Sequence, residues 1–197
     1  KDLYYGEMAV RTDASSRFGK DHRWGMFWSL GLMWNIKNEP FLKDIEWLTG
    51  AQIALSTGTS GNSEIPYYDH LALVSGGPKY NDEAGIYPKQ SGNEELSWEQ
   101  TWSNNIGLRL GFFNRVNLDI DFYHKKTTDM LMSVPESYAI TGEGYRWDNI
   151  GAMVNRGVEV SVNSDIIRTK DFTWNLNANV SYNKNKLVEL YNGVQEY

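Results

Sequence analysis

Apolar and polar residues alternate without exception between positions 172 and 183. Every even position is apolar, from Phe172 to Tyr182, and every odd position is Thr, Ser or Asn. Because successive side chains of a β-strand point to opposite faces, the pattern predicts a strand with one apolar and one neutral polar face. A soluble β-sandwich usually turns charge outward, whereas a transmembrane barrel strand turns apolar residues to lipid and polar residues to a water-filled lumen. The asparagine-rich face favours the second arrangement.

The whole chain is predicted to be all-β, with about seven strands and no substantial helix. A segment around Pro40 and Leu42 has room for one helical turn. Gly, Asn, Asp and Ser mark the breaks between strands. The expected strands span residues 3–12, 23–36, 49–59, 97–112, 115–127, 149–166 and 171–187. No repeat or linker is visible, so residues 1–197 are interpreted as one antiparallel up-and-down meander.

The connections between these strands alternate in length. Residues 113–115 and 169–171 are short enough for tight hairpin turns, whereas 60–96 and 128–148 are long. Alternate connections of a meander fall at opposite ends, so one end should carry tight turns and the other long irregular loops. Outer-membrane barrels show this asymmetry, with short periplasmic turns and long extracellular loops.

Apolar residues on the last four strands lie near the tight-turn end. Toward the long loops the same face becomes polar or cationic, at Asn104, His124, Arg156 and Lys184. A membrane that cuts every strand at one height would produce this change, and segment 172–182 has the roughly 9–11 residues that a tilted strand needs to cross it. Aromatic residues are expected at both boundaries, namely Phe112, Phe113, Phe172 and Trp174 near the turns and Phe122 and Tyr182 near the loops.

The opposite face of these strands is predicted to line a lumen. It carries charged side chains and a row of asparagines, which suit contact with water. The candidate lumen residues are Arg109, Asp119, Asp121, Glu159, Asn175, Asn177 and Asn179. A soluble two-layer β protein with one polar face remains the alternative.

Composition narrows the function classes. The 197 residues carry a net charge of −6, which argues against nucleic-acid binding because such proteins need a basic patch. The mean hydropathy is −0.54 and no apolar run approaches the length of a membrane helix, which argues against helical membrane spans. Barrel strands are not excluded, because their alternating pattern averages to a mild hydropathy. Without cysteine there is no disulfide framework. No signal peptide follows Lys1, so either a signal has been removed or the chain begins inside a longer protein.

The sequence carries no convincing enzyme signature. Asp119 and Asp121 share a face and could do acid–base work, but such pairs are common on solvated faces. The histidines, His22, His70 and His124, lack metal-ligand spacing. Loop carboxylates at Asp69, Asp82 and Glu83 could bind Ca²⁺, although no loop matches an EF-hand. We therefore expect neither enzymatic activity nor a cofactor.

Aromatic residues gather in the long loops, among Gly, Asn and Asp. Rings flanked by amide and carboxylate groups suit carbohydrate, since sugar CH faces stack on rings while hydroxyls form hydrogen bonds. The candidate substrate-binding residues are Tyr67, Tyr68, Asp69, Tyr80, Tyr145 and Trp147. Packing within the loops is the competing interpretation.

Short motifs follow one another in order along nearly the whole chain. They are Val10–Gly19, Arg23–Ser29, Trp34–Glu39, Ser56–Asn62, Gly92–Glu99, Asn105–Leu108, Gly111–Arg115, Phe122–Asp129, Asn149–Gly151, Asn155–Glu159 and Asn183–Lys186. Each is weak alone, but the ordered set resembles the SusC/RagA-type TonB-dependent outer-membrane transporters of Bacteroidetes.

This resemblance implies a location and a function. Family members carry a signal peptide, an N-terminal extension, a plug domain and a transmembrane barrel of about 22 strands. Residues 1–197 would then be an interior fragment of the C-terminal barrel half, with plug and extension absent, in the bacterial outer membrane. The implied function is TonB-energised import of a glycan or peptide with a SusD-like surface lipoprotein, and a homodimer of such pairs is a further expectation. A siderophore or vitamin receptor and a secreted carbohydrate-binding β-sandwich remain the alternatives.

Overall fold

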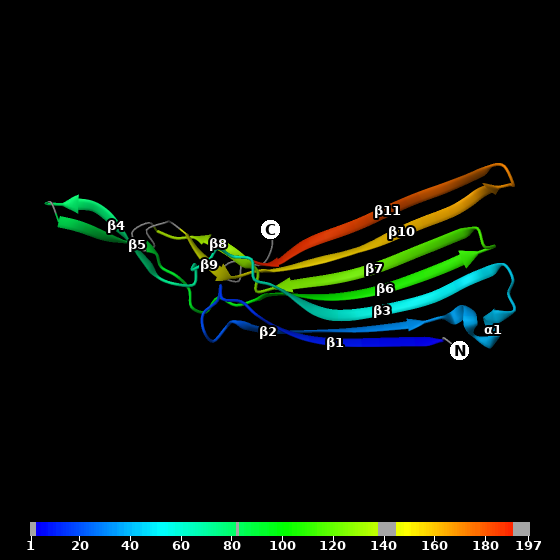
Figure 1. Cartoon of the computed structure of the whole chain (residues 1–197), viewed down its shortest axis with the longest axis horizontal. Coiled ribbons are helices and arrows are strands. Elements are labelled where there is room, and N and C mark those ends of the chain that lie inside the picture. The colour runs from blue at the N-terminus through cyan, green and yellow to red at the C-terminus, as the bar shows by residue number, and fades with distance from the viewer. Residues whose placement is uncertain (1–2, 82, 138–144, 191–197) are drawn as a thin grey trace.

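A seven-stranded antiparallel sheet dominates the computed structural model, which describes residues 3–81, 83–137 and 145–190 (Figure 1). Its strands pair in the order in which they occur along the chain, so the predicted up-and-down meander is confirmed. Each predicted strand is present, with ends shifted by a few residues. The strands are β1 (Tyr4–Ala14), β2 (Trp24–Trp34), β3 (Leu48–Asn62), β6 (Glu99–Phe112), β7 (Val116–Thr128), β10 (Ala152–Arg168) and β11 (Thr173–Glu189).

Two further hairpins lie in segments that the sequence analysis had treated as irregular, and there the prediction was wrong. They are β4 (Leu73–Tyr80) with β5 (Glu83–Gln90), and β8 (Leu131–Pro135) with β9 (Tyr145–Asn149). Glycine and proline interrupt the first hairpin and weaken its strand signal. The strands of the second hairpin are only five residues long, which is too short for a clear alternation.

The predicted helical turn is present between β2 and β3. A 3₁₀ turn (η1, Ile36–Asn38) precedes a one-turn helix (α1, Pro40–Lys43), and the Lys37 ammonium donates hydrogen bonds to three carbonyls that follow it, of Leu42, Lys43 and Ile45. These contacts satisfy carbonyls that a short helix leaves unpaired. Among the described residues no helix has the length and apolarity needed to cross a membrane.

The two tight turns and the two longest connections lie at opposite ends of the sheet, as predicted (Figure 1). The connection from β2 to β3, which contains η1 and α1, lies at the tight-turn end as well. At one end, residues 113–115 join β6 to β7, with Phe113 and Asn114 both at positive φ (53° and 54°) as in a type I′ hairpin turn. The Arg115 amide donates to the Phe112 carbonyl at 2.9 Å. The hairpins β4–β5 and β8–β9 extend from the other end.

The register aligns the boundary of the apolar band across four strands. Ile106, Phe122, Val158 and Tyr182 form one row of cross-strand partners. The next row toward the loops is polar or cationic throughout, consisting of Asn104, His124, Arg156 and Lys184. The change from apolar to polar therefore occurs at one register position on β6, β7, β10 and β11, as the sequence predicted.

On β2 the apolar residues continue further toward the loops. Leu30 lies in the row of Asn104, through Thr57 on β3, yet Met26 and Trp24 beyond it are still exposed apolar side chains. The aligned boundary is therefore confined to β6, β7, β10 and β11.

The apolar face has no second layer over it within the described residues. Met8, Ile106 and Val180 are 74%, 53% and 67% exposed. A β-sandwich would bury such side chains, so the two-layer alternative is wrong for this chain. The buried apolar cluster lies instead at the loop end, where Phe18, Ile65 and Leu96 pack together.

Candidate functional site

The predicted lumen residues share the face opposite the apolar band. Arg109 on β6 lies directly across from Asp119 on β7, and Asp121 lies across from Glu159 on β10. The three asparagines follow one another along β11, and the Asn175 amide donates to Asp165 Oδ1 at 2.8 Å. The structure thus brings all seven residues onto one polar face, although their role in lining a lumen remains a proposal.

Two hollows on this face are open to polar solutes. One, of ≈ 480 Å³, lies beside the Asp121–Glu159 pair and also receives Lys125 and several amide side chains. The other, of ≈ 600 Å³, lies nearer the tight turns and contains Gln52, Arg109 and Asp119. Like charges placed directly opposite each other are unfavourable, so the acidic pair favours a nearby cation or water-filled space.

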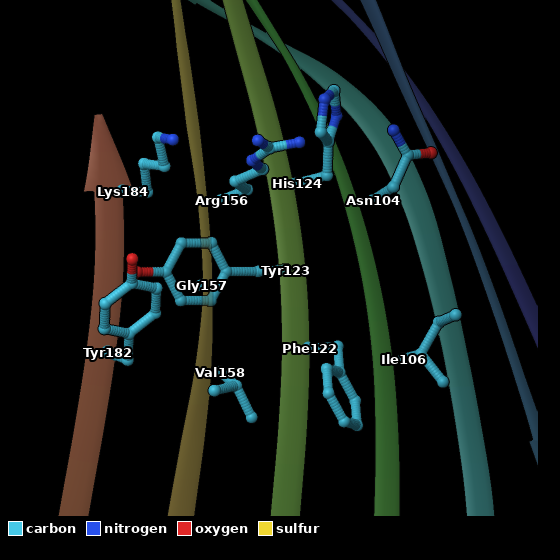
Figure 2. A pocket seen from close by; sticks show the side chains of 10 residues that line it. All are labelled: Asn104, Ile106, Phe122, Tyr123, His124, Arg156, Gly157, Val158, Tyr182 and Lys184. Atoms are coloured by element: carbon cyan, nitrogen blue, oxygen red, sulfur yellow. The ribbon is translucent and has the colours of Figure 1, made fainter. Parts of the chain in front are cut away.

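The Tyr123 ring lies across the backbone of β10 at Gly157 (Figure 2). A Cβ atom added to Gly157 would lie 2.6 Å from the Tyr123 hydroxyl and 2.3 Å from the Tyr182 carbonyl oxygen. Glycine is therefore required for this close approach of ring and strand. An aromatic ring packed over a glycine in a sheet stabilises that position. Tyr123 and Gly157 are direct cross-strand partners, and the pairing of a tyrosine with a glycine becomes visible only once the register is known.

Three loops meet in a small core, here named the loop junction and defined by Phe18, Ile65 and Leu96. The Phe18 and Leu96 side chains are fully buried, and Ile65 is 3% exposed. The Trp98 ring packs edge-to-face on Phe18, and its Nε1 donates to the Arg23 carbonyl at 3.0 Å. Residues from separate connections of the meander are thus fixed to one another above the sheet.

Asn149 joins the connection between β7 and β10 to this junction. Its Nδ2 donates to the carbonyls of Ser97 and Asp129, at 3.0 and 2.9 Å, and its Oδ1 accepts from the Ser97 amide at 2.8 Å. Gly19 allows the backbone near Glu94 to approach, because a Cβ there would lie 2.4 Å from the Glu94 carbonyl oxygen. Motifs Val10–Gly19, Gly92–Glu99 and Asn149–Gly151, which are distant in sequence, therefore meet in space.

The predicted substrate-binding residues differ in their surroundings. Tyr67 and Tyr68 are 65% and 64% exposed, and the Arg17 guanidinium lies 4.8 Å from the Tyr67 ring centroid. Tyr145 is partly exposed at the start of β9. Trp147 packs against the loop junction, which fits loop packing better than ligand binding.

The positions of the other loop candidates give no argument for or against ligand binding. Asp69 precedes the buried His70, and Tyr80 is the last residue of β4. Asp82 lies outside the described residues, so the structure does not test the calcium alternative at this loop. In the part of the chain that the structure describes, no group of three or more His, Cys, Asp or Glu side chains could hold a metal ion.

Comparisons with known proteins agree on one family. The family model described as TonB dependent receptor-like, beta-barrel matches residues 5–195. TonB-dependent receptor SusC of Bacteroides thetaiotaomicron is 39% identical over 203 residues, covering 96% of this chain and 20% of SusC. TonB-dependent receptor P39 of Formosa agariphila is 38% identical over 191 residues, covering 96% of this chain and 18% of P39.

A solved structure has the same architecture. The RagAB peptide importer in its closed-closed state matches with a TM-score of 0.91 and 38% identity, covering 98% of this chain and 21% of that chain. The chain thus spans about a fifth of the length of the proteins that it matches.

Replacing Asn149 with alanine should loosen the loop junction. The variant removes the hydrogen bonds to the Ser97 amide and to two carbonyls, which are part-buried or exposed, and each such bond contributes about 0.5–1.5 kcal/mol. We expect faster chymotrypsin cleavage within loops 63–98 and 129–151 of the intact protein. Asn175→Ala, which removes one exposed hydrogen bond near the tight turns, is the control. Equal cleavage of the two variants would contradict a structural role for Asn149.

Proposed function

The chain belongs to the TonB-dependent receptor-like β-barrel family, and from this we propose that it forms part of the wall of an importer for bulky nutrients in the bacterial outer membrane. One observation carries the proposal. A single-layer sheet places an apolar band on one face and charged and amide groups on the other, with the boundary aligned across four strands. Lipid on one side and a water-filled path on the other account for both faces.

The sheet is one section of a larger wall in this proposal. Strands β1 and β11 each have a single neighbour among the described strands, so one edge of each is available for pairing. An open edge in a membrane leaves backbone groups unsatisfied, whereas closure of a barrel pairs them. Energy for import comes from TonB acting on a plug domain in this account, and the chain contributes the wall and the loops.

The cargo that suits the polar face and the loops is a glycan or a peptide. Asparagine side chains and mixed charges offer both donors and acceptors, and the exposed Tyr67 and Tyr68 rings offer flat surfaces for stacking. The similarity to RagAB, a peptide importer, and the equal similarity to SusC support this class of cargo over a siderophore or vitamin. The proposed mechanism is binding and gated passage, with no covalent step.

A surface lipoprotein of the SusD type is the proposed partner at the loop end. Hairpin β4–β5 extends beyond the sheet (Figure 1) and places Val74 and Ile86 on one of its faces, where they are 72% and 78% exposed. Exposed apolar side chains on a projecting hairpin favour contact with another protein. Pairs of such a complex would form the homodimer that the sequence resemblance suggested.

Uptake measurements test the proposed function. Cells that carry the intact protein should import labelled oligosaccharides or oligopeptides, and deletion of its gene should abolish import. Tyr67→Ala and Tyr68→Ala should each weaken cargo affinity by roughly 2- to 10-fold, because a ring contact contributes about 0.5–1.5 kcal/mol. Phe113→Ala, at an exposed aromatic of the tight-turn end, is the matched control. Import of siderophores or vitamins alone would overturn the proposal.

Ile86→Asp should weaken binding of the lipoprotein partner. A charge in an apolar contact typically costs more than 1 kcal/mol at the centre of an interface, so co-purification should fall by about tenfold. Ser75→Asp, which adds the same charge on the other face of the hairpin, should leave it unchanged. Equal effects of the two substitutions would exclude the Val74–Ile86 face as the contact surface.

A further inference from the structure

A hollow of ≈ 650 Å³ on the apolar face lies at the boundary of the apolar band (Figure 2). It extends over four neighbouring strands, β6, β7, β10 and β11. Its lower half is lined by the apolar row Ile106, Phe122, Val158 and Tyr182, and its upper half by the row Asn104, His124, Arg156 and Lys184. The site therefore has an apolar floor and a polar, basic rim.

Charge is distributed unequally between the two faces in this region. The acidic residues Asp119, Asp121, Glu159 and Asp165 lie on the opposite face. Near the hollow the apolar face carries basic side chains at its loop end, namely His124, Lys126, Arg156, Lys184 and Lys186. Glu189 pairs with Ala152 on this face, four residues along β10 from Arg156, so no carboxylate lies in the row of the rim.

The rim contains a like-charge pair that a ligand would stabilise. Arg156 and Lys184 are direct cross-strand partners, and cations directly opposite each other are destabilising. Neither forms an ion pair among those found in the described part of the chain. An anion placed between them would offset their repulsion and accept hydrogen bonds from both.

A ligand that matches this hollow must place negative charge at the basic rim and hydrocarbon on the apolar floor. A free anion satisfies the rim but leaves the floor uncovered, and a neutral lipid covers the floor but leaves the rim uncompensated. We propose that this hollow binds a phosphorylated lipid of the membrane leaflet at the loop end, with its phosphate between Arg156 and Lys184 and its acyl chains along Ile106, Phe122, Val158 and Tyr182. The proposal rests on the barrel-wall assignment and is independent of the cargo.

Long basic side chains and tyrosine are suited to this position. Lysine and arginine extend their charged ends to the membrane–water boundary while their methylene groups contact apolar surface. Tyr182, which is 64% exposed, places a ring against the acyl region and its hydroxyl near the headgroups. The rows in Figure 2 show this order along the strands, with Lys184 beyond Tyr182 and Arg156 beyond Val158.

Lipid titration of the intact, detergent-purified protein by native mass spectrometry tests the site. Phosphatidylglycerol and phosphatidylcholine of the same acyl chains are the probes, and inorganic phosphate is the soluble competitor. We expect bound phosphatidylglycerol in preference to phosphatidylcholine, and a loss of about 30-fold in that preference in the double variant Arg156→Gln/Lys184→Gln, because each basic residue near the headgroups contributes about 1 kcal/mol. Arg156→Lys, which keeps the charge and the fold, should retain most of the preference.

Lys125→Gln is the matched control, because Lys125 lies on β7 next to His124 but on the polar face. It removes one positive charge, where the double variant removes two, and should leave lipid preference unchanged. Equal binding of the two lipids, or an equal loss in Lys125→Gln and in the double variant, would overturn the proposal. Displacement of the lipid by millimolar inorganic phosphate would overturn it as well, since it would show a site for free anions.

Discussion

The two-residue period of the β-strand is the constraint on which this structure depends. In a sheet that is one layer thick, every side chain belongs to one of two faces, and a slip of one residue in the register would exchange them. Pairing Phe122 with Ile106 and Val158, and Asp121 with Gly107 and Glu159, keeps apolar and charged residues apart across the strands. The apolar face therefore needs an apolar medium, and the backbone stays paired within the sheet.

The two ends of the sheet are stabilised in different ways. At the tight-turn end, aromatic side chains such as Phe113 and Trp174 stay exposed, as they do at membrane boundaries. At the loop end, Phe18, Ile65 and Leu96 form the buried cluster, and Asn149 adds hydrogen bonds to backbone groups. The wall thus depends on its surroundings, whereas the loops carry a core of their own.

The sequence predicted the seven strands of the wall and the face of each residue, because alternation over ten or more residues is a strong signal. It did not predict hairpins β4–β5 and β8–β9, whose strands are short or interrupted by glycine and proline. It also missed the loop junction, since contacts of Phe18 with Ile65 and Leu96 join separate loops that no local pattern relates. Exposure of Tyr67 was expected, whereas the packing of Trp147 depends on that junction.

Spin-label accessibility at neighbouring positions tests the assignment of the two faces most directly. The chain has no cysteine, so single cysteines at Val160 and Ser161 on β10 can each carry a label in a cysteine-free form of the intact protein in lipid bilayers. The label at position 160 should collide mainly with oxygen, which concentrates in lipid, and the label at position 161 with a water-soluble nickel complex. Equal accessibility of both labels to both reagents, or the reverse order, would contradict a wall with lipid on one face and water on the other.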